Sequence, residues 1–201
     1  MMGERGRSPA RQGFDQFVAD VADGLLRSAY LITWNLPDAE DLVQECLLKV
    51  ARRWPRVHKM AHPAAYARTV LVHLALDEGK RRSRRRAELG SEVGDALEET
   101  EDGSAVHLFG RVEANTDMLL VLGELPPRQR VALVLRYFED LSEAEVAKAM
   151  GCSVGTVKST TSRALDRLRE AIERSNLAAV QANGNSNMQA GTRDSEGSFT
   201  P

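Results

Sequence analysis

Apolar side chains recur at steps of three and four residues through the first part of the chain, a spacing that predicts helices with one buried face. The first apolar stripe comprises Phe14, Phe17, Val18, Val21, Leu25, Ala29 and Ile32. We expect Gly24 to loosen or divide this helix, since glycine is a poor helix former. A turn at 35–37 ends it, and Asp38 is expected to cap a second helix over 38–53.

The helix predicted over 38–53 has two stripes of different character on opposite sides. One stripe is apolar and is expected to face the core; it contains Val43, Cys46, Leu47, Val50 and Trp54. The other, here called the acidic ridge, contains Asp41, Gln44, Glu45 and Leu48. A single exposed leucine is common on protein surfaces. The ridge is therefore either an ordinary solvated face or a surface that binds another protein.

A loop and a third long helix complete the first half of the chain. The loop covers 54–61, and the helix opens at His62–Pro63 because proline is favoured in a first helical turn. This helix leads into the basic run, Lys80–Arg86, in which six of seven residues are Lys or Arg. The next segment, 88–102, holds seven Asp or Glu and no Lys or Arg. So abrupt a reversal of charge indicates a boundary, although the net charge of the chain is only −2.

Helical patterns resume beyond residue 112. A short apolar helix is expected around Met118, Leu119 and Leu122, and a longer one over 128–138. In the longer helix, five apolar side chains are expected to be mostly buried: Val131, Leu133, Val134, Leu135 and Tyr137.

Two further helices are marked by capping signals. Ser142 and Glu145 form a capping box, with serine at the cap and glutamate three residues later. The helix that they start is expected to end at Gly151. Ser153 is expected to cap a final helix that reaches about Arg174.

These two helices fit a helix-turn-helix. Ala147, Gly151 and Val157 supply the small residue, the turn glycine and the buried branched residue at the spacing that the motif needs. In such a unit the start of the second helix enters the major groove of DNA. Its outward side chains, suited to phosphates and base edges, are Thr156, Lys158, Ser159, Ser162 and Arg163. The alternative is an αα-hairpin without a ligand, whose turn also often holds glycine.

Together the patterns predict an all-α protein of two small helical domains joined by a flexible acidic linker. The linker and the C-terminal segment have too few large apolar residues to offset the entropy of ordering. The expected division is a disordered N-terminus 1–12, a first domain 13–87, the linker 88–111, a second domain 112–174 and a disordered tail 175–201.

Composition and motifs exclude several classes of protein. No apolar stretch approaches the roughly 18 residues of a membrane span, and the N-terminus lacks the apolar core of a signal peptide. We therefore expect a cytoplasmic protein without membrane insertion. Cys46 and Cys152 form neither a metal pair nor a redox motif. Because the chain has no glycine-rich phosphate loop, nucleophile elbow or metal-ligand cluster, we expect no catalytic residue, metal or cofactor.

Four stretches together resemble the ECF (extracytoplasmic function) family of RNA polymerase sigma factors. Each is weak alone, but four in the right order and at the right separations are specific, and they cover most of 14–173 except the linker. They are 38–45 (DAEDLVQE), 62–66 (HPAAY) with 77–86, 125–130 (LPPRQR) with 137–142 (YFEDLS), and 154–159 (VGTVKS) followed by Arg163–Ala164.

The resemblance implies a role for each surface. The acidic ridge would grip the coiled coil of the largest subunit of core RNA polymerase. Promoter DNA would be melted and read at its minus-10 element by Arg56, His58, Lys59, His62, Lys80, Arg81, Arg82, Arg84 and Arg85. The minus-35 element would be recognised by Thr156, Lys158, Ser159, Ser162 and Arg163. Many members are held inactive by an anti-sigma protein, so a partner of that kind is also an expectation.

Three positions depart from the pattern of the family. Members usually carry Asn where His73 stands, often Trp where Tyr66 stands, and commonly Arg where Thr160 stands. The last change is expected to remove a base or phosphate contact, so the minus-35 sequence cannot be carried over from relatives. His73 is either a pH-sensitive contact or a tolerated helix residue.

Two rival classes remain to be compared with this interpretation. A stand-alone helix-turn-helix regulator would share the second domain, but it leaves the acidic ridge and the linker without a role. An enzyme would need a catalytic cluster, which the sequence does not contain. Stable binding to core RNA polymerase distinguishes a sigma factor from both.

Overall fold

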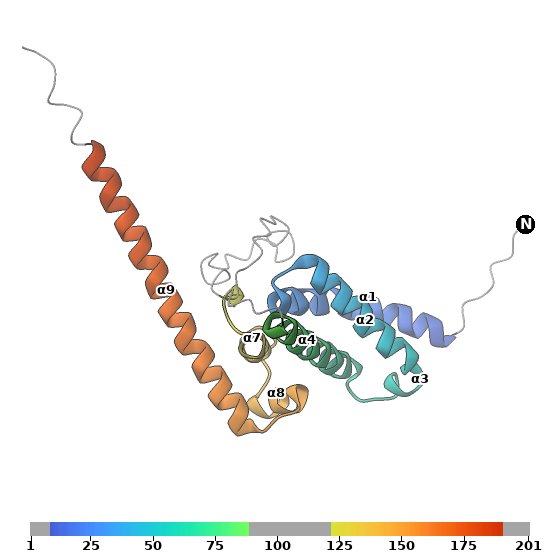
Figure 1. The fold of residues 1–201 in the computed structure, drawn as a ribbon. Coiled ribbons are helices and arrows are strands. Elements are labelled where there is room, and N and C mark those ends of the chain that lie inside the picture. The colour runs from blue at the N-terminus through green and yellow to red at the C-terminus, as the bar shows by residue number, and fades with distance from the viewer. Residues whose placement is uncertain (1–8, 89–121, 191–201) are drawn as a thin grey trace, which may run out of the picture.

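The computed structural model describes residues 9–88 and 122–190, and every regular element in these two ranges is helical (Figure 1). The all-α prediction is confirmed. None of the helices in these ranges is long and apolar enough to cross a membrane. The elements are α1 (Pro9–Thr33), α2 (Leu36–Arg52), α3 (Trp54–Val57), α4 (Pro63–Glu88), α7 (Pro127–Leu133), the π-helix η1 (Val134–Phe138), α8 (Glu143–Met150) and α9 (Val154–Ala190).

The first half, α1 to α4, differs from the prediction in three places. α1 begins at Pro9 and runs unbroken through Gly24, because its core side is held by buried residues such as Leu25 and Ala29. Their burial outweighs the roughly 1 kcal/mol that glycine costs relative to alanine within a helix. The cap of α2 is Asn35 rather than Asp38: its side-chain oxygen accepts from the backbone N–H of Asp38 at 2.9 Å. The expected loop over 54–61 contains the short helix α3.

The helix expected over 128–138 changes character midway. α7 passes into η1, whose wider turns are shown by the backbone N–H of Glu139, which donates to the carbonyl of Val134 at 3.0 Å. A π-helical turn accommodates an extra residue and so shifts the phase of the side chains that follow. The expectation that Tyr137 is buried is therefore wrong, because its side chain is 61% exposed. Glu139 instead turns toward the first half of the chain, where it contacts α1 and α4.

α9 continues well past Arg174, where the sequence predicts that it ends. Its backbone is helical as far as Ala190, within the segment expected to be a disordered tail. The sequence from Ser175 to Ala190 contains no proline, and alanines at 178, 179 and 182 favour a helix. The expected linker, apart from Glu88 at the end of α4, and the helix expected around Met118 lie outside the described residues, except for Leu122.

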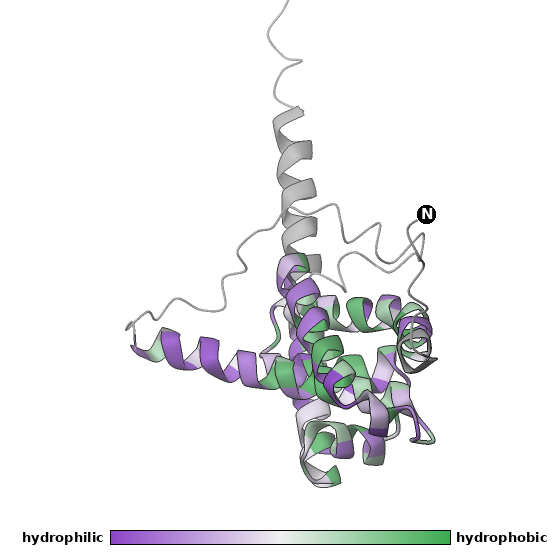
Figure 2. Ribbon diagram, turned by 90° about the vertical axis from the view of Figure 1, so that its right-hand side faces the viewer, coloured by the Kyte–Doolittle hydropathy of each residue, from purple (hydrophilic) through white to green (hydrophobic). Residues whose placement is uncertain are grey.

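The two halves pack on each other through a continuous apolar core. One cluster of buried side chains includes Leu71 and Val72 of α4 together with Val131, Leu135 and Met150 of the second half. α4 lies between α1 and α2 on one side and α7 and α8 on the other (Figure 1). The apolar residues gather where the helices meet, whereas the last turns of α4 project from the body and are hydrophilic (Figure 2).

Candidate functional site

The acidic ridge lies on the outward face of α2. All four of its side chains, Asp41, Gln44, Glu45 and Leu48, are exposed, while the opposite side of the helix is buried. Leu48 is 53% exposed, so a large apolar side chain meets solvent on a helix whose opposite side is buried. Within the ridge, Glu45 pairs with Lys49 on the same helix at 3.0 Å. The stripe assignment made from the sequence is therefore confirmed as geometry, with an apolar side chain in the middle of a carboxylate-rich surface.

A shallow hollow of about 290 Å³ adjoins the ridge, between α1 and α2. Its lining includes Gln44 of the ridge, Glu40 and Leu47 of α2, and Asp23 and Leu26 of α1. The sequence analysis did not predict the contribution of α1, because the apolar stripe of that helix indicates only its buried face. Leu26 was the available signal, since it is an apolar residue that lies beside that stripe rather than on it. The surface around the ridge is thus wider than one helix.

Helix α3 and the turn that joins it to α4, together called the α3–α4 turn, carry exposed cationic and titratable side chains. Arg56, His58, Lys59 and His62 are all exposed, as predicted for a surface that meets DNA. His58 is oriented by its own helix, because its Nδ1 lies 2.7 Å from the carbonyl oxygen of Trp54. That arrangement makes Nδ1 the donor and leaves Nε2 directed elsewhere. Met60, at the tip of the turn, is 42% exposed and places an apolar side chain among these groups.

The basic run at the end of α4 is exposed but partly neutralised. Lys80 pairs with Asp77 at 3.2 Å, and Arg81 pairs with Glu78 at 3.6 Å. Arg82 reaches Asp38 of α2 at 2.6 Å. Burial alone would lower the pKa of Arg82, but its hydrogen bonds to Asp38 and Glu78 raise the pKa instead.

The two remaining cations of the run whose side chains are described, Arg84 and Arg85, differ from the other three. Both are exposed, and neither forms a salt bridge with another residue of the described ranges. They lie in the projecting last turns of α4 (Figure 2). Among the described residues, the cations of the run without a salt bridge are therefore those nearest the end of the helix.

The helix-turn-helix predicted from the sequence is present in α8 and α9. Ser142 caps α8 in a complete capping box with Glu145, and these hydrogen bonds lower the pKa of the Glu145 carboxyl. Gly151 ends α8 with φ of +61°, a left-handed conformation that glycine adopts without strain. Ser153 then caps α9, accepting from the backbone N–H of Thr156 at 3.1 Å. Ala147 and Val157 are buried where the two helices cross.

The outward face of α9 has the side chains expected of a recognition helix. Lys158, Ser159, Ser162 and Arg163 are exposed, and Thr156 is half-buried. Lys158 pairs with Glu143 of α8 at 3.5 Å, and both side chains remain largely exposed. Such surface pairs contribute little, about 0–1 kcal/mol, so Lys158 can exchange its partner at low cost.

Thr160 requires a correction. The sequence interpretation treated this position as a lost DNA contact, but Thr160 is only 8% exposed and lies on the buried side of α9. A side chain at position 160 faces the core of the second half and supplies no contact to DNA in this arrangement. The substitution of threonine for the more common arginine therefore concerns packing.

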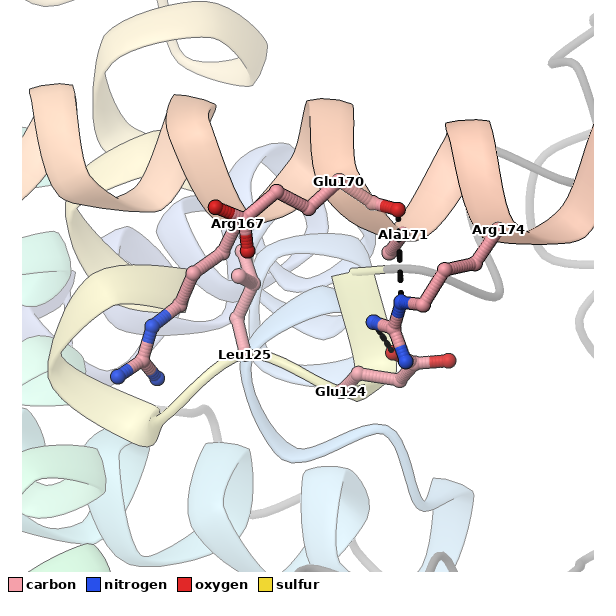
Figure 3. A pocket seen from close by; sticks show the side chains of 6 residues that line it. All are labelled: Glu124, Leu125, Arg167, Glu170, Ala171 and Arg174. Carbon is pink, nitrogen blue, oxygen red and sulfur yellow. Dashed lines mark hydrogen bonds and ion pairs between the residues drawn. The ribbon is translucent and has the colours of Figure 1, made fainter.

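A second hollow, of about 250 Å³, separates α9 from the segment that precedes α7 (Figure 3). Arg174 points across it to Glu124 at 3.3 Å, whereas Arg167 points away from that pair (Figure 3). The hollow is lined by equal numbers of acidic and basic side chains: Glu124, Glu170, Arg167 and Arg174, with Leu125 and Ala171. Because its acidic and basic side chains are equal in number, the hollow offers no site of net charge. The ion pair of Arg174 with Glu124 instead connects α9 to the segment that precedes α7.

Comparison with known proteins matches both halves to one family. Residues 17–86 match the family described as Sigma-70 region 2, and residues 116–168 match Sigma-70, region 4. An RNA polymerase sigma-E factor from Streptomyces avermitilis is 36% identical over 168 residues, which are 83% of this chain and 88% of that protein. An ECF RNA polymerase sigma factor, SigE, from Mycolicibacterium smegmatis is 30% identical and is matched over 88% of this chain and 68% of its own length.

A solved structure agrees in fold. The sigma factor RpoE from Bartonella quintana, crystallised in complex with the anti-sigma factor NepR, superimposes with a TM-score of 0.61 at 26% identity, covering 81% of this chain and 98% of that chain. One matched region lies in each half of the chain, region 2 before region 4. This chain therefore belongs to the ECF family of RNA polymerase sigma factors, which direct promoter-specific initiation of transcription.

Proposed function

We propose that this sigma factor divides its work among three exposed surfaces. The acidic ridge of α2 binds core RNA polymerase, the α3–α4 turn and the basic run hold the minus-10 element, and the outward face of α9 recognises the minus-35 element. The observation that carries the proposal is Leu48, an exposed leucine on the same outward face of α2 as Asp41 and Glu45, opposite the buried side of the helix. An apolar centre with a charged rim is the usual composition of a protein-binding surface.

The chemistry of the α3–α4 turn suits unpaired DNA. Melting a promoter requires that unstacked bases be held, which proteins achieve with cationic grooves and with side chains on which bases can stack. Arg56, Lys59 and the imidazoles of His58 and His62 supply the polar contacts, and the exposed charges of Arg84 and Arg85 hold the phosphates nearby. We assign these residues to the minus-10 element and no catalytic role to any part of the chain.

The outward face of α9 suits duplex DNA. The first turns of a recognition helix lie in the major groove, where arginine can bind guanine with two hydrogen bonds and serine can bind several bases. We assign the recognition of bases to Ser159, Ser162 and Arg163. We assign phosphate binding to Lys158 and Thr156. Since polymerase and promoter DNA are both in the cytoplasm, we place the working protein there.

Reconstitution with core RNA polymerase tests this function directly. The purified chain is mixed with core polymerase and a library of genomic DNA fragments, and the 5′ ends of the transcripts are sequenced. We expect new start sites that share one pair of sequences near positions −10 and −35 and that depend on the chain. A stand-alone regulator would bind fragments without polymerase and would produce no new starts.

We also propose an anti-sigma protein as a restraining partner, because the Bartonella sigma factor of similar fold was crystallised with one. The tagged chain, recovered from the organism that encodes it, should carry a second protein that excess core polymerase displaces. A co-purifying protein that stays bound when core polymerase binds would not be an anti-sigma factor.

A further inference from the structure

An ion pair joins the last turns of α4 to the start of α2. The guanidinium of Arg82 lies 2.6 Å from a carboxylate oxygen of Asp38, which is in the first turn of α2. The two helices run antiparallel, because farther along α2 the thiol of Cys46 donates to the carbonyl of Ala67, near the start of α4. The ion pair therefore connects the helix that carries the acidic ridge to the helix that carries the basic run.

This ion pair lies beyond the buried part of α4. Leu76 is the last buried residue of the helix among those whose side chains are described. Arg82 follows it by six residues, which is about 9 Å along the helix axis, in the turns that project from the body (Figure 2). No other described side chain of α4 after Leu76 forms an ion pair with another helix. The contact with Asp38 therefore restrains the direction of the projecting turns relative to α2.

Two carboxylates surround the guanidinium of Arg82. Besides Asp38, Glu78 lies one helical turn earlier, with an oxygen 3.4 Å from Nε of Arg82. The carboxylate of Asp38 is itself favoured at the N-terminus of α2, where the helix dipole stabilises negative charge. A phosphate that approached Arg82 would have to displace Asp38 and would then lie close to both carboxylates. Because like charges at such distances repel, DNA phosphate is an unfavourable partner for this arginine.

The next two arginines of the basic run, Arg84 and Arg85, have no competing carboxylate. Both are exposed, and neither forms a salt bridge with another described residue. They follow Arg82 by two and three residues, so they lie in the turn that the ion pair restrains. Phosphate contacts fix the register of a protein on DNA. The direction of this turn therefore decides which phosphates the two arginines reach.

We propose that Arg82 is a positioning residue rather than a DNA contact, and that its ion pair with Asp38 directs Arg84 and Arg85 at the DNA of the minus-10 element. The proposal rests on the assignment of the basic run to that element given above. Because α2 also carries the acidic ridge, the same ion pair sets the position of these arginines relative to polymerase. A carboxylate among the DNA-binding cations thereby promotes the binding of DNA.

Asp38→Asn separates this proposal from the alternative that Arg82 binds DNA itself. If Arg82 were a DNA contact, loss of the competing carboxylate would strengthen promoter opening. We expect opening to weaken about three- to fivefold instead, which is within the range of an ion pair whose side chains are 46% and 32% exposed. Opening by the holoenzyme is measured from permanganate oxidation of unpaired thymines in the minus-10 element. Unchanged or stronger opening would overturn the proposal.

Asp77→Asn is the matched control for Asp38→Asn. It also removes one carboxylate beside the basic run, but exposed Asp77 pairs with Lys80 of its own helix at 3.2 Å. Opening by this variant should therefore not fall more than about twofold below that of the parent. A loss as large as that of Asp38→Asn would show that charge alone, rather than the contact between helices, is responsible. Both variants should bind core polymerase normally in a pull-down, and loss of binding by Asp38→Asn would place Asp38 in the polymerase-binding surface and overturn the proposal.

Arg82→Gln completes a double-mutant cycle with Asp38→Asn. If the two residues act as a pair, each single variant should weaken opening by about the same factor, and the double variant should weaken it no further. Losses that multiply in the double variant would mean that the residues act separately, contrary to the proposal. Helical circular dichroism of each variant checks that the fold is intact.

The double substitution Arg84→Gln, Arg85→Gln distinguishes failure of this proposal from failure of the proposed function. It removes two exposed cations of the basic run and should weaken opening whatever the role of Arg82. If it leaves opening unchanged, the assignment of the basic run to the minus-10 element is wrong. If it weakens opening while Asp38→Asn does not, the assignment stands and only the positioning role of Arg82 is wrong.

Discussion

The outward faces of α2 and α9 are built alike and differ in chemistry. Each belongs to a helix whose opposite side is buried. The buried residues include Val43, Cys46 and Val50 in α2, and Val157 and Ala164 in α9. The face of α2 is acidic around one exposed leucine, whereas the face of α9 is cationic and rich in hydroxyl groups. Both faces lie on helices that pack against a buried core.

The difference indicates which partner each face suits. An exposed apolar side chain is useful only where a protein partner can bury it, because burial of apolar surface gives about 25 cal/mol per Å². Hydroxyl and guanidinium groups suit phosphates and base edges, which offer acceptors at fixed positions. Changes on the outward face of α2 should therefore leave the function of the outward face of α9 intact, and changes on α9 should leave that of α2 intact.

The largest effect is expected for the acidic ridge. The double substitution Asp41→Ala, Leu48→Ala should abolish detectable binding to core polymerase, because truncation of central interface residues typically costs 2 kcal/mol or more. Both side chains are exposed, so helical circular dichroism should stay unchanged. The measurement is a pull-down with core polymerase.

Lys49→Ala is the matched control for the ridge. Lys49 is exposed on the same helix and lies beside the ridge, where it pairs with Glu45 at 3.0 Å. Its loss should leave polymerase binding within about twofold, since exposed i,i+4 pairs contribute only about 0.3–0.5 kcal/mol. Normal binding by the double variant would disprove the assignment of the ridge.

On the other face, Arg163→Ala should change sequence preference. We expect relaxed preference at particular base pairs of the minus-35 element, at a cost of about 1–3 kcal/mol for a lost bidentate contact. Binding to core polymerase should be normal. Selection from a promoter library randomised at −35 measures the preference, and a selection identical to that of the parent would exclude Arg163 from base reading.

Lys158→Ala should have a smaller and more uniform effect. Because lysine meets phosphates as a point charge, its loss should weaken all promoter sequences alike and reduce the salt slope of binding by about 1. In the parent, Lys158 can reach a phosphate once it gives up its exposed salt bridge with Glu143. Titrations of the holoenzyme at several salt concentrations would show this, and a change confined to one base pair would contradict it.

The smallest effect is expected for the end of the chain. Truncation after Arg174 removes the last part of α9 but none of the outward residues assigned to DNA. Transcription in vitro should match that of the full chain at equal stability. Reduced activity would mean that the segment takes part in initiation, and increased activity would mean that it restrains the factor.

Much of the fold could be predicted from local patterns. The long helix from Pro63, the capping box at Ser142 and the turn at Gly151 each follow from residues close in sequence, and all three are present. The buried stripe of α2 was also predicted correctly. Three features could not be predicted: the start of α1, its unbroken passage through Gly24 and the extent of α9. They depend on packing or on weak helix propensities that no single residue indicates.

Some features of the candidate site could also be predicted from local patterns, and others could not. Exposure of the ridge and of Arg163 follows from helical phase, so it could be predicted. Exposure of Tyr137 and burial of Thr160 could not, since the first depends on a π-helical turn and the second on where the helices of the second half meet. The contact of Glu139 with Arg68 joins residues far apart in sequence, and only the tertiary fold brings such residues together.

The continuous core between the halves has a consequence for protein engineering. Side chains such as Leu71 and Leu135 belong to one packed cluster, although they come from different matched regions. A chimaera that joins this chain's first half to the DNA-reading half of a relative would place two unmatched apolar surfaces together. Such a hybrid would expose apolar area and aggregate unless the residues of α4, α7 and α8 that face each other were also changed to match. New promoter specificity is therefore better obtained by changing the outward residues of α9 than by exchanging whole halves.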